Sequence, residues 1–153
     1  MSDKLDFLAF GAHPDDVELG CGATIAKLVS QGKKVGIVDL TRGELGTRGS
    51  AEIRTKETNE ASKILGITIR ENMNFKDGFF RNDEDHQLKI IQVIRKYQPD
   101  FVFCNAPDDR HIDHPKGSQL IVEASFLSGL SKIITDDSLG NTQKHWRPKN
   151  IYH

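Results

Sequence analysis

Short apolar runs, each bounded by turn residues, alternate along the chain with stretches whose apolar residues fall at helical spacing. The runs predict buried strands over residues 5–10, 34–40, 67–75 and 100–104. The other stretches predict helices over residues 19–31 and 50–65, over a segment carrying Leu88 to Tyr97, and over one carrying Leu120 to Leu127. This alternation indicates an α/β fold with a mainly parallel sheet covered by helices on both faces.

Details of single elements sharpen this prediction. Ser50 can cap the helix over 50–65, and Gly66 can end it. That helix would bury an apolar stripe made of Ile53, Ala61, Ile64 and Leu65. At the other end of the chain, Ile151 and Tyr152 read as the start of a further strand, which indicates a domain that is incomplete at its C-terminus.

The predicted topology brings two polar loops together. In the common doubly wound strand order, 3-2-1-4-5, the first and fourth strands are neighbours, and ligands bind outside the carboxyl ends of the strands there. The loop after the first strand contains His13-Pro14-Asp15-Asp16, and the loop after the fourth runs from Asp108 to His114. If the chain adopts this order, its two loops richest in ligand groups meet.

The first loop has the spacing of a metal site. His13 and Asp16 are three residues apart, and residues three apart share one face of a helical turn while the residue between them points elsewhere. His13 and Asp16 could therefore bind one metal, while Asp15 stays free to accept a proton. The alternative is an acidic helix start, in which Asp15, Asp16 and Glu18 only complement the helix dipole.

The second loop could complete the site. His114 would join His13 and Asp16, because two imidazoles and one carboxylate with an open position for water are a catalytic zinc arrangement. Zinc would polarise a carbonyl group and lower the pKa of its bound water to roughly 7. His111, if protonated, could stabilise an oxyanion or protonate a leaving amine, and Asp113 could orient His111 and favour its charged form. The alternative is a solvated polar loop.

Composition narrows the class of protein. The 153 residues suffice for one domain, and 21 basic against 22 acidic residues give a net charge of −1, which argues against a nucleic-acid or membrane surface driven by charge. No apolar run reaches the length of a membrane span, and residues 1–6 show no signal peptide, so we expect a cytoplasmic protein. Cys21 and Cys104 are expected to be free thiols. The sequence is compatible with a homo-oligomer and does not determine the oligomeric state.

Taken together, the motifs of the two polar loops resemble those of one enzyme family. Ala12-His13-Pro14-Asp15-Asp16-Val17-Glu18 with the later His111-Ile112-Asp113-His114 resembles the LmbE-like, or PIG-L, family of zinc-dependent N-acetylglucosamine deacetylases. The likeness extends over residues 1–153, which would be a single LmbE-like domain, and includes Thr41-Arg42-Gly43-Glu44, Gly46-Thr47-Arg48-Gly49, Arg54, Glu57 and Asp77-Gly78. Within the family, the chain looks most like the bacillithiol-biosynthesis deacetylases that act on N-acetylglucosaminyl malate.

The resemblance implies a Rossmann-like three-layer sandwich and one zinc ion per chain. By match to the family's motifs, His13, Asp16 and His114 would bind zinc, Asp15 would be the general base, and His111 the oxyanion partner.

Three further positions match the family's substrate contacts. Asp77 matches a position that holds sugar hydroxyls, and Arg54 and Arg110 match positions near the aglycone or substrate anion. Simpler interpretations are a turn residue for Asp77 and solvated charges for arginines such as Arg42, Arg48 and Arg54. Ile112 stands where the family often has proline, and family members continue beyond residue 153.

Other functions remain as alternatives at this point. The chain could deacetylate another N-acetylglucosaminide, or it could be a non-catalytic zinc- or sugar-binding module. A metallophosphoesterase would need two metals with bridging carboxylates, whereas this sequence shows ligands for one.

Overall fold

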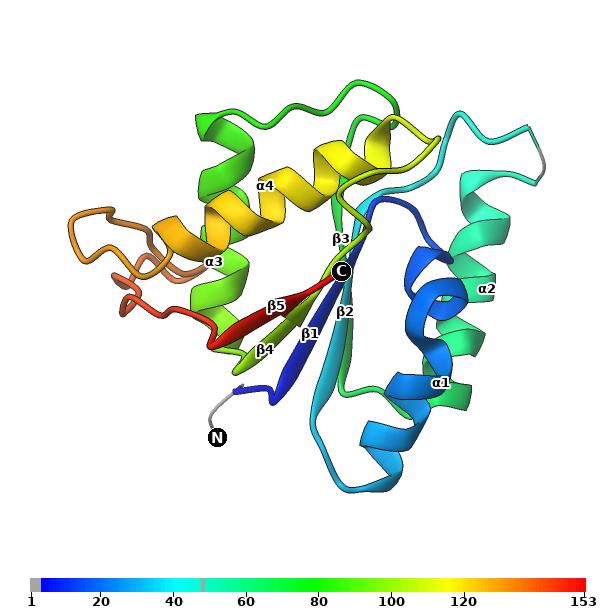
Figure 1. Ribbon diagram of the computed structural model, residues 1–153, viewed down its shortest axis with the longest axis horizontal. Coiled ribbons are helices and arrows are strands. Elements are labelled where there is room, and N and C mark those ends of the chain that lie inside the picture. Colours follow the sequence, from blue (N-terminus) through cyan, green and yellow to red (C-terminus); the bar gives the residue numbers. More distant parts are fainter. Residues whose placement is uncertain (1–3, 48) are drawn as a thin grey trace.

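Five parallel strands form one sheet in the computed structural model, which describes residues 4–47 and 49–153 (Figure 1). Their order across the sheet is β3-β2-β1-β4-β5. The strands are β1 (Phe7–Gly11), β2 (Val35–Thr41), β3 (Ile69–Phe75), β4 (Phe101–Phe103) and β5 (Asn150–Tyr152). This order confirms the predicted topology, with β1 and β4 as neighbours.

Helices cover both faces of the sheet, as expected for a three-layer sandwich (Figure 1). They are α1 (Asp16–Ser30) and α2 (Ala51–Leu65) on one face, and α3 (Glu84–Tyr97) and α4 (Asp113–Leu127) on the other. Successive residues of β1 point to opposite faces, so Leu8 and Phe10 pack in the core with α3 and α4, whereas Ala9 packs with α1. Within the described residues, no helix combines the length and apolar character needed to cross a membrane.

The ends of α2 are capped as predicted, whereas α1 begins earlier than predicted. The Ser50 hydroxyl accepts a hydrogen bond from the Ile53 backbone N–H at the start of α2, and Gly66 ends that helix in the left-handed conformation, as predicted. In contrast, α1 begins at Asp16 rather than at residue 19, because the acidic first turn is itself helical.

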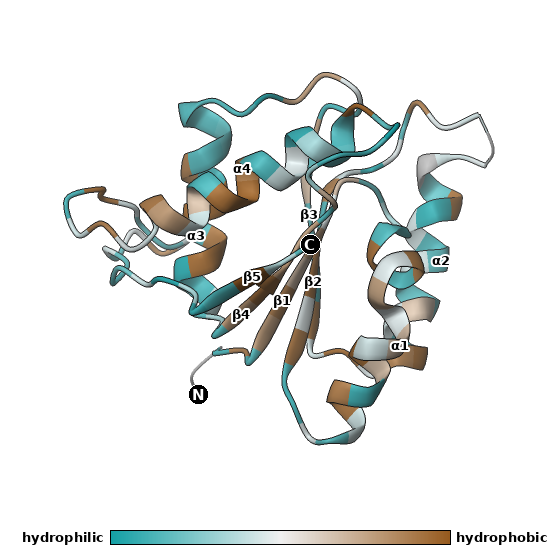
Figure 2. Ribbon diagram, viewed as in Figure 1, coloured by the Kyte–Doolittle hydropathy of each residue, from teal (hydrophilic) through white to brown (hydrophobic). Residues whose placement is uncertain are grey.

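The apolar stripe predicted for α2 is wrong in part. Ile53 and Ile64 are 48% and 85% exposed, and Figure 2 shows α2 as largely hydrophilic. Leu65, at the end of the helix, does pack against the core beneath α1. Helix α2 therefore contacts the sheet through fewer apolar residues than its sequence indicates.

Tight packing at the end of β1 shapes the turn into α1. A Cβ added at Gly11 would lie 3.1 Å from both the Asp16 Cβ and the His13 backbone oxygen. A side chain at this position would therefore push against the turn that carries His13 and Asp16, so the glycine lets the chain fold back closely.

Candidate functional site

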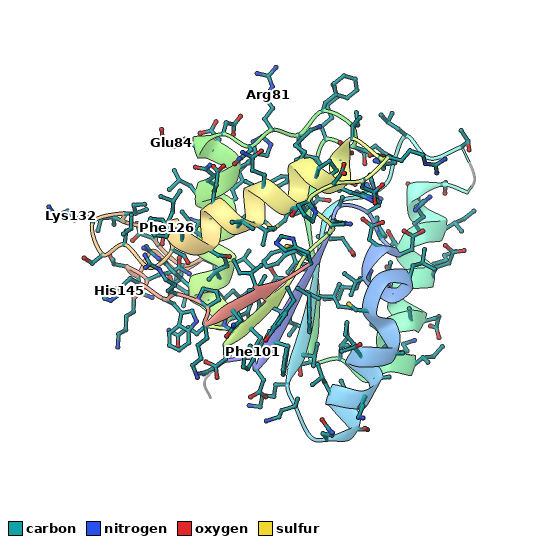
Figure 3. All side chains as sticks on the ribbon, viewed as in Figure 1. Arg81, Glu84, Phe101, Phe126, Lys132 and His145 are labelled. Atoms are coloured by element: carbon teal, nitrogen blue, oxygen red, sulfur yellow. The ribbon has the colours of Figure 1, made fainter. Side chains whose placement is uncertain are left out.

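The two polar loops meet at the carboxyl edge of β1 and β4. Phe101, labelled in Figure 3, marks the amino end of β4, and the site lies beyond the opposite end of that strand. The Asp16 Oδ2 atom lies 3.6 Å from His13 Nδ1 and 3.3 Å from His114 Nε2. The three residues predicted as zinc ligands thus lie together, with one nitrogen of each imidazole facing the same Asp16 oxygen.

Carboxylates also hold the far nitrogen of each of these imidazoles. His13 Nε2 lies 3.0 Å from Asp77 Oδ1 and 3.2 Å from Asp113 Oδ2, and His114 Nδ1 lies 2.9 Å from Asp109 Oδ2. Histidines that bind a metal usually donate their other ring N–H to a carboxylate or carbonyl group, which fixes the free nitrogen toward the ion. The donors present, two imidazoles and one carboxylate with this support, fit zinc.

Asp16 is fixed as an anion by hydrogen bonds. Its Oδ2 accepts from the His13 backbone N–H at 3.0 Å and from Asn105 Nδ2 at 3.0 Å, while Asn105 Oδ1 accepts from the Ala12 backbone N–H at 2.9 Å. Burial favours the protonated acid, but the hydrogen bonds from His13 and Asn105 outweigh it and lower the pKa of Asp16. Asn105 therefore links β4 to the first loop and orients the carboxylate.

The same negative surroundings act on His13. Burial opposes a charge on this imidazole, yet the hydrogen bond with Asp16 and the charges of Asp16 and Asp77 raise the pKa of His13 to about 9. A site in which a buried imidazole is this readily charged favours a cation, either a proton or a metal ion.

Asp15, predicted as the general base, differs from Asp16 in its exposure, its partners and the direction of its pKa shift. Its side chain is 54% exposed, and its Oδ2 lies 3.6 Å from Arg54 Nη1. Its backbone φ of 121° lies in a region that residues other than glycine rarely adopt, and such strain clusters at functional sites. Burial and the nearby Asp16 raise the pKa of Asp15, which suits a group that accepts a proton.

His111 stands beside both predicted histidine ligands. Its ring centroid lies 4.6 Å from that of His13 and 4.9 Å from that of His114, with the His111 and His114 rings stacked. One nitrogen from each of these three rings lies within 4.8 Å of the others, so His111 could itself replace Asp16 as the third ligand. A second group of possible ligand atoms within 4.8 Å of one another joins His13 to Asp77 and Asp113, whereas Asp16 is in neither group.

The side chain of Asp113 contacts His13, whereas only its backbone contacts His111. Its buried carboxylate contacts His13, the Gly78 backbone N–H at 2.8 Å and Lys116 Nζ at 2.9 Å. The hydrogen bond described between Asp113 and His111 runs from the Asp113 backbone N–H to His111 Nδ1 at 3.3 Å. Since this nitrogen accepts, a neutral His111 would carry its proton on Nε2.

Two of the residues predicted to bind substrate, Asp77 and Arg54, contact residues of the site. Asp77 is buried, and its Oδ2 accepts from the Leu45 backbone N–H at 2.9 Å, so both of its oxygens have protein partners. The Arg54 guanidinium donates to the Pro14 carbonyl at 3.3 Å. Arg110 is exposed, and Arg48 lies outside the described residues.

Arg54 packs against the glycine-rich loop. A Cβ added at Gly43 or Gly46 would lie 3.2 or 2.9 Å from an Arg54 guanidinium nitrogen. These glycines leave room for a guanidinium that reaches from α2 to Asp15.

Three residues that the sequence did not single out hold the predicted site residues in place. Asn105, Asp109 and Lys116 each contact a predicted site residue, and all three lie in or just after the loop that follows β4. Their position in a polar loop beside the site was visible in the sequence, but the partner of each side chain was not.

Comparisons with known proteins find similar sequences among deacetylases. The family model described as PIG-L: GlcNAc-PI de-N-acetylase matches residues 8–125. The chain is 37% identical over 113 residues to an uncharacterized deacetylase, YaiS, of Escherichia coli, covering 70% of this chain and 60% of that protein. It is 29% identical over 154 residues to the diacetylchitobiose deacetylase of Thermococcus kodakarensis, covering 94% of this chain and 58% of that protein.

A solved structure is similar over nearly the whole chain. The conserved protein TT1542 from Thermus thermophilus superposes with a TM-score of 0.87 at 41% identity, covering 96% of this chain and 64% of that one. The chain thus spans about 60% of the length of each of these three proteins.

Proposed function

Because the chain belongs to the PIG-L family of de-N-acetylases, we propose that it is a zinc-dependent deacetylase that hydrolyses the N-acetyl group of an N-acetylglucosamine conjugate. The observation that carries this proposal is the shared Asp16 oxygen, which faces one nitrogen of His13 and one of His114. A carboxylate behind each imidazole turns that nitrogen toward the common point, as in catalytic zinc sites.

Each residue then has a separate task. His13, Asp16 and His114 would hold one zinc ion, which would supply the Lewis acid that activates water and polarises the acetyl carbonyl. Asp15, exposed and held by Arg54, accepts the proton of the attacking water and returns it to the departing amine.

His111 acts at the carbonyl oxygen. Its ring contacts those of His13 and His114, and the residue is exposed. With Nδ1 accepting from the Asp113 backbone, the opposite nitrogen donates a hydrogen bond to the oxygen on which negative charge develops.

For the substrate, we propose the small-molecule conjugate N-acetylglucosaminyl malate, as in bacillithiol biosynthesis in the cytoplasm. The motif resemblance supports this choice, and Arg54 and Arg110 are the cations assigned to the malate carboxylates, since guanidinium groups bind carboxylates in a bidentate manner. The match to the family's motifs assigns Asp77 to the sugar hydroxyls, and both of its oxygens also have protein partners, His13 and the Leu45 backbone N–H.

The test measures metal content and acetate release on the same preparation. Purified protein should hold about one zinc per chain and release acetate from N-acetylglucosaminyl malate faster than from N-acetylglucosamine or diacetylchitobiose. The Asp15→Asn variant, which keeps the ligands, is the control for contaminating deacetylases.

Other outcomes point to other functions. Faster acetate release from diacetylchitobiose would keep the deacetylase and overturn the malate assignment. Two metals per chain with phosphate release from phosphoesters would indicate a metallophosphoesterase. Bound zinc with no acetate released from any of these sugars would indicate a binding module.

A further inference from the structure

One carboxylate contacts both histidines of the second loop. Asp109 Oδ2 lies 2.9 Å from His114 Nδ1, and Asp109 Oδ1 accepts a hydrogen bond from the His111 backbone N–H at 2.9 Å. The two oxygens of a single side chain thus tie together the predicted ligand His114 and the predicted oxyanion partner His111.

The contact with His114 decides which nitrogen of that ring faces the site. An N–H on Nδ1 donates to Asp109, which leaves the lone pair on Nε2, and this nitrogen is the one 3.3 Å from Asp16 Oδ2. If the ring were turned or carried its proton on Nε2, no lone pair would be directed to the place where the ligands converge.

The contact with His111 fixes the loop next to the site. The hydrogen bond to its backbone N–H holds the turn that stacks the His111 ring on the His114 ring, whose planes are inclined by only 21°. The two rings therefore depend on the same carboxylate for their relative placement.

We propose that Asp109 is a positioning residue that selects the tautomer and orientation of His114 and sets the place of His111 beside it. This inference rests on the proposed zinc site, and nothing in it requires Asp109 to touch the metal or the substrate. Asp109 is about one-third exposed and lies just before α4, so removing its side chain leaves the packed core intact.

The neighbouring residue provides a matched control. Asp108 has the same side chain one position earlier, is exposed, and makes no contact described within residues 4–47 and 49–153. Asp108→Ala and Asp109→Ala therefore change the same charge and the same volume, and only the second removes the two contacts.

Zinc affinity is measured by competition with a chromogenic chelator, using zinc alone as the probe. Asp109→Ala should weaken zinc binding by about 10- to 100-fold, the usual range for a residue that orients a metal ligand, while Asp108→Ala stays within about twofold of the wild type. Asp109→Asn should fall between them, because its side chain has one acceptor oxygen for two donors.

A second measurement separates positioning from general support of the fold. Nitrogen-detected spectra of histidine in the metal-free protein, at a pH where the ring is neutral, should show a protonated Nδ1 on His114 in the wild type and in Asp108→Ala, and a loss of this single tautomer in Asp109→Ala. The melting temperatures of the metal-free proteins should be alike for the two alanine variants.

The outcomes distinguish this inference from the proposed function. Equal zinc affinity and an unchanged His114 signal in Asp109→Ala would overturn the positioning role. A wild type that binds zinc through His114 but releases no acetate would overturn the deacetylase proposal and leave the role of Asp109 standing. A wild type that binds no zinc would overturn both.

Discussion

Arg70 holds Asp39 through two parallel hydrogen bonds, from Nε to Oδ2 at 2.8 Å and from Nη2 to Oδ1 at 2.9 Å. The two residues lie on the neighbouring strands β3 and β2, and Asp39 is only 3% exposed. The same guanidinium also pairs with Glu18 in the first turn of α1, two residues after the predicted ligand Asp16. This ion pair therefore connects the sheet to the helix that begins at the site.

Removing the cation should destabilise the protein strongly. Arg70→Met leaves the Asp39 carboxylate buried without its partner, and breaking one half of a buried ion pair costs about 3–5 kcal/mol. Urea unfolding at neutral pH measures this loss. The double variant Asp39→Leu with Arg70→Met should recover much of the stability, because the buried carboxylate is gone and only Glu18, which is 21% exposed, loses its partner. A double variant no more stable than Arg70→Met would contradict this explanation.

Asp39 should also make stability depend on pH. Burial raises the pKa of Asp39 from 3.8 to about 6, although hydrogen bonds from Arg70 oppose the shift. Because the folded-state pKa lies above the unfolded value, the contribution of this group is complete below about pH 4 and is lost as the pH rises through about 6.

The Asp39→Asn variant lacks this titration and isolates it. The free energy of unfolding of the wild type minus that of Asp39→Asn should fall by roughly 3 kcal/mol between pH 4 and pH 7. A difference that stays flat over this range would show that Asp39 titrates at its ordinary value in the folded protein.

The ligand set is tested by metal content. His13→Ala, Asp16→Ala and His114→Ala should each lose the single zinc ion, because each removes one of three protein ligands. His111→Ala is the deciding variant, since its ring is close enough to His13 and His114 to be a ligand instead of Asp16. If His111→Ala lost zinc and Asp16→Ala kept it, the three-histidine set would be the right one.

Asp15 should act on the rate and not on the metal. Asp15→Asn keeps the size of the side chain and removes the base, so zinc should stay near one per chain while acetate release falls by roughly a hundredfold or more. Zinc content and initial rates on one preparation check both halves. A zinc-free Asp15→Asn protein would indicate that Asp15 is a zinc ligand and would contradict its assignment as a general base that does not bind the metal.

Arg54 is placed to serve either the substrate or the general base. If it binds the malate carboxylates, Arg54→Ala should raise KM for the malate conjugate and leave plain N-acetylglucosamine nearly unaffected. If its contact with Asp15 matters more, kcat should fall on both substrates. We expect the first pattern to dominate, and equal losses of kcat on the two substrates would refute it.

The sequence by itself determined the elements and the place of the site. Strand and helix periodicity is local, and it located the four main strands and the caps Ser50 and Gly66. A parallel order then required the loops after β1 and β4 to meet, so His13, Asp16 and His114 could be grouped before any contact was known.

The tertiary structure alone decided which carboxylate supports which imidazole. Asp77 and Asp113 reach His13 across 64 and 100 residues of sequence, so these pairings depend on strand register and on the start of α4, which no local pattern records. The same holds for Asp109: its sequence position would equally allow its carboxylate to face solvent or to contact His114, and only the fold decides for His114. Neighbouring residues in a polar loop share composition, but only the folded backbone fixes the direction of each side chain, and direction determines which groups can bond.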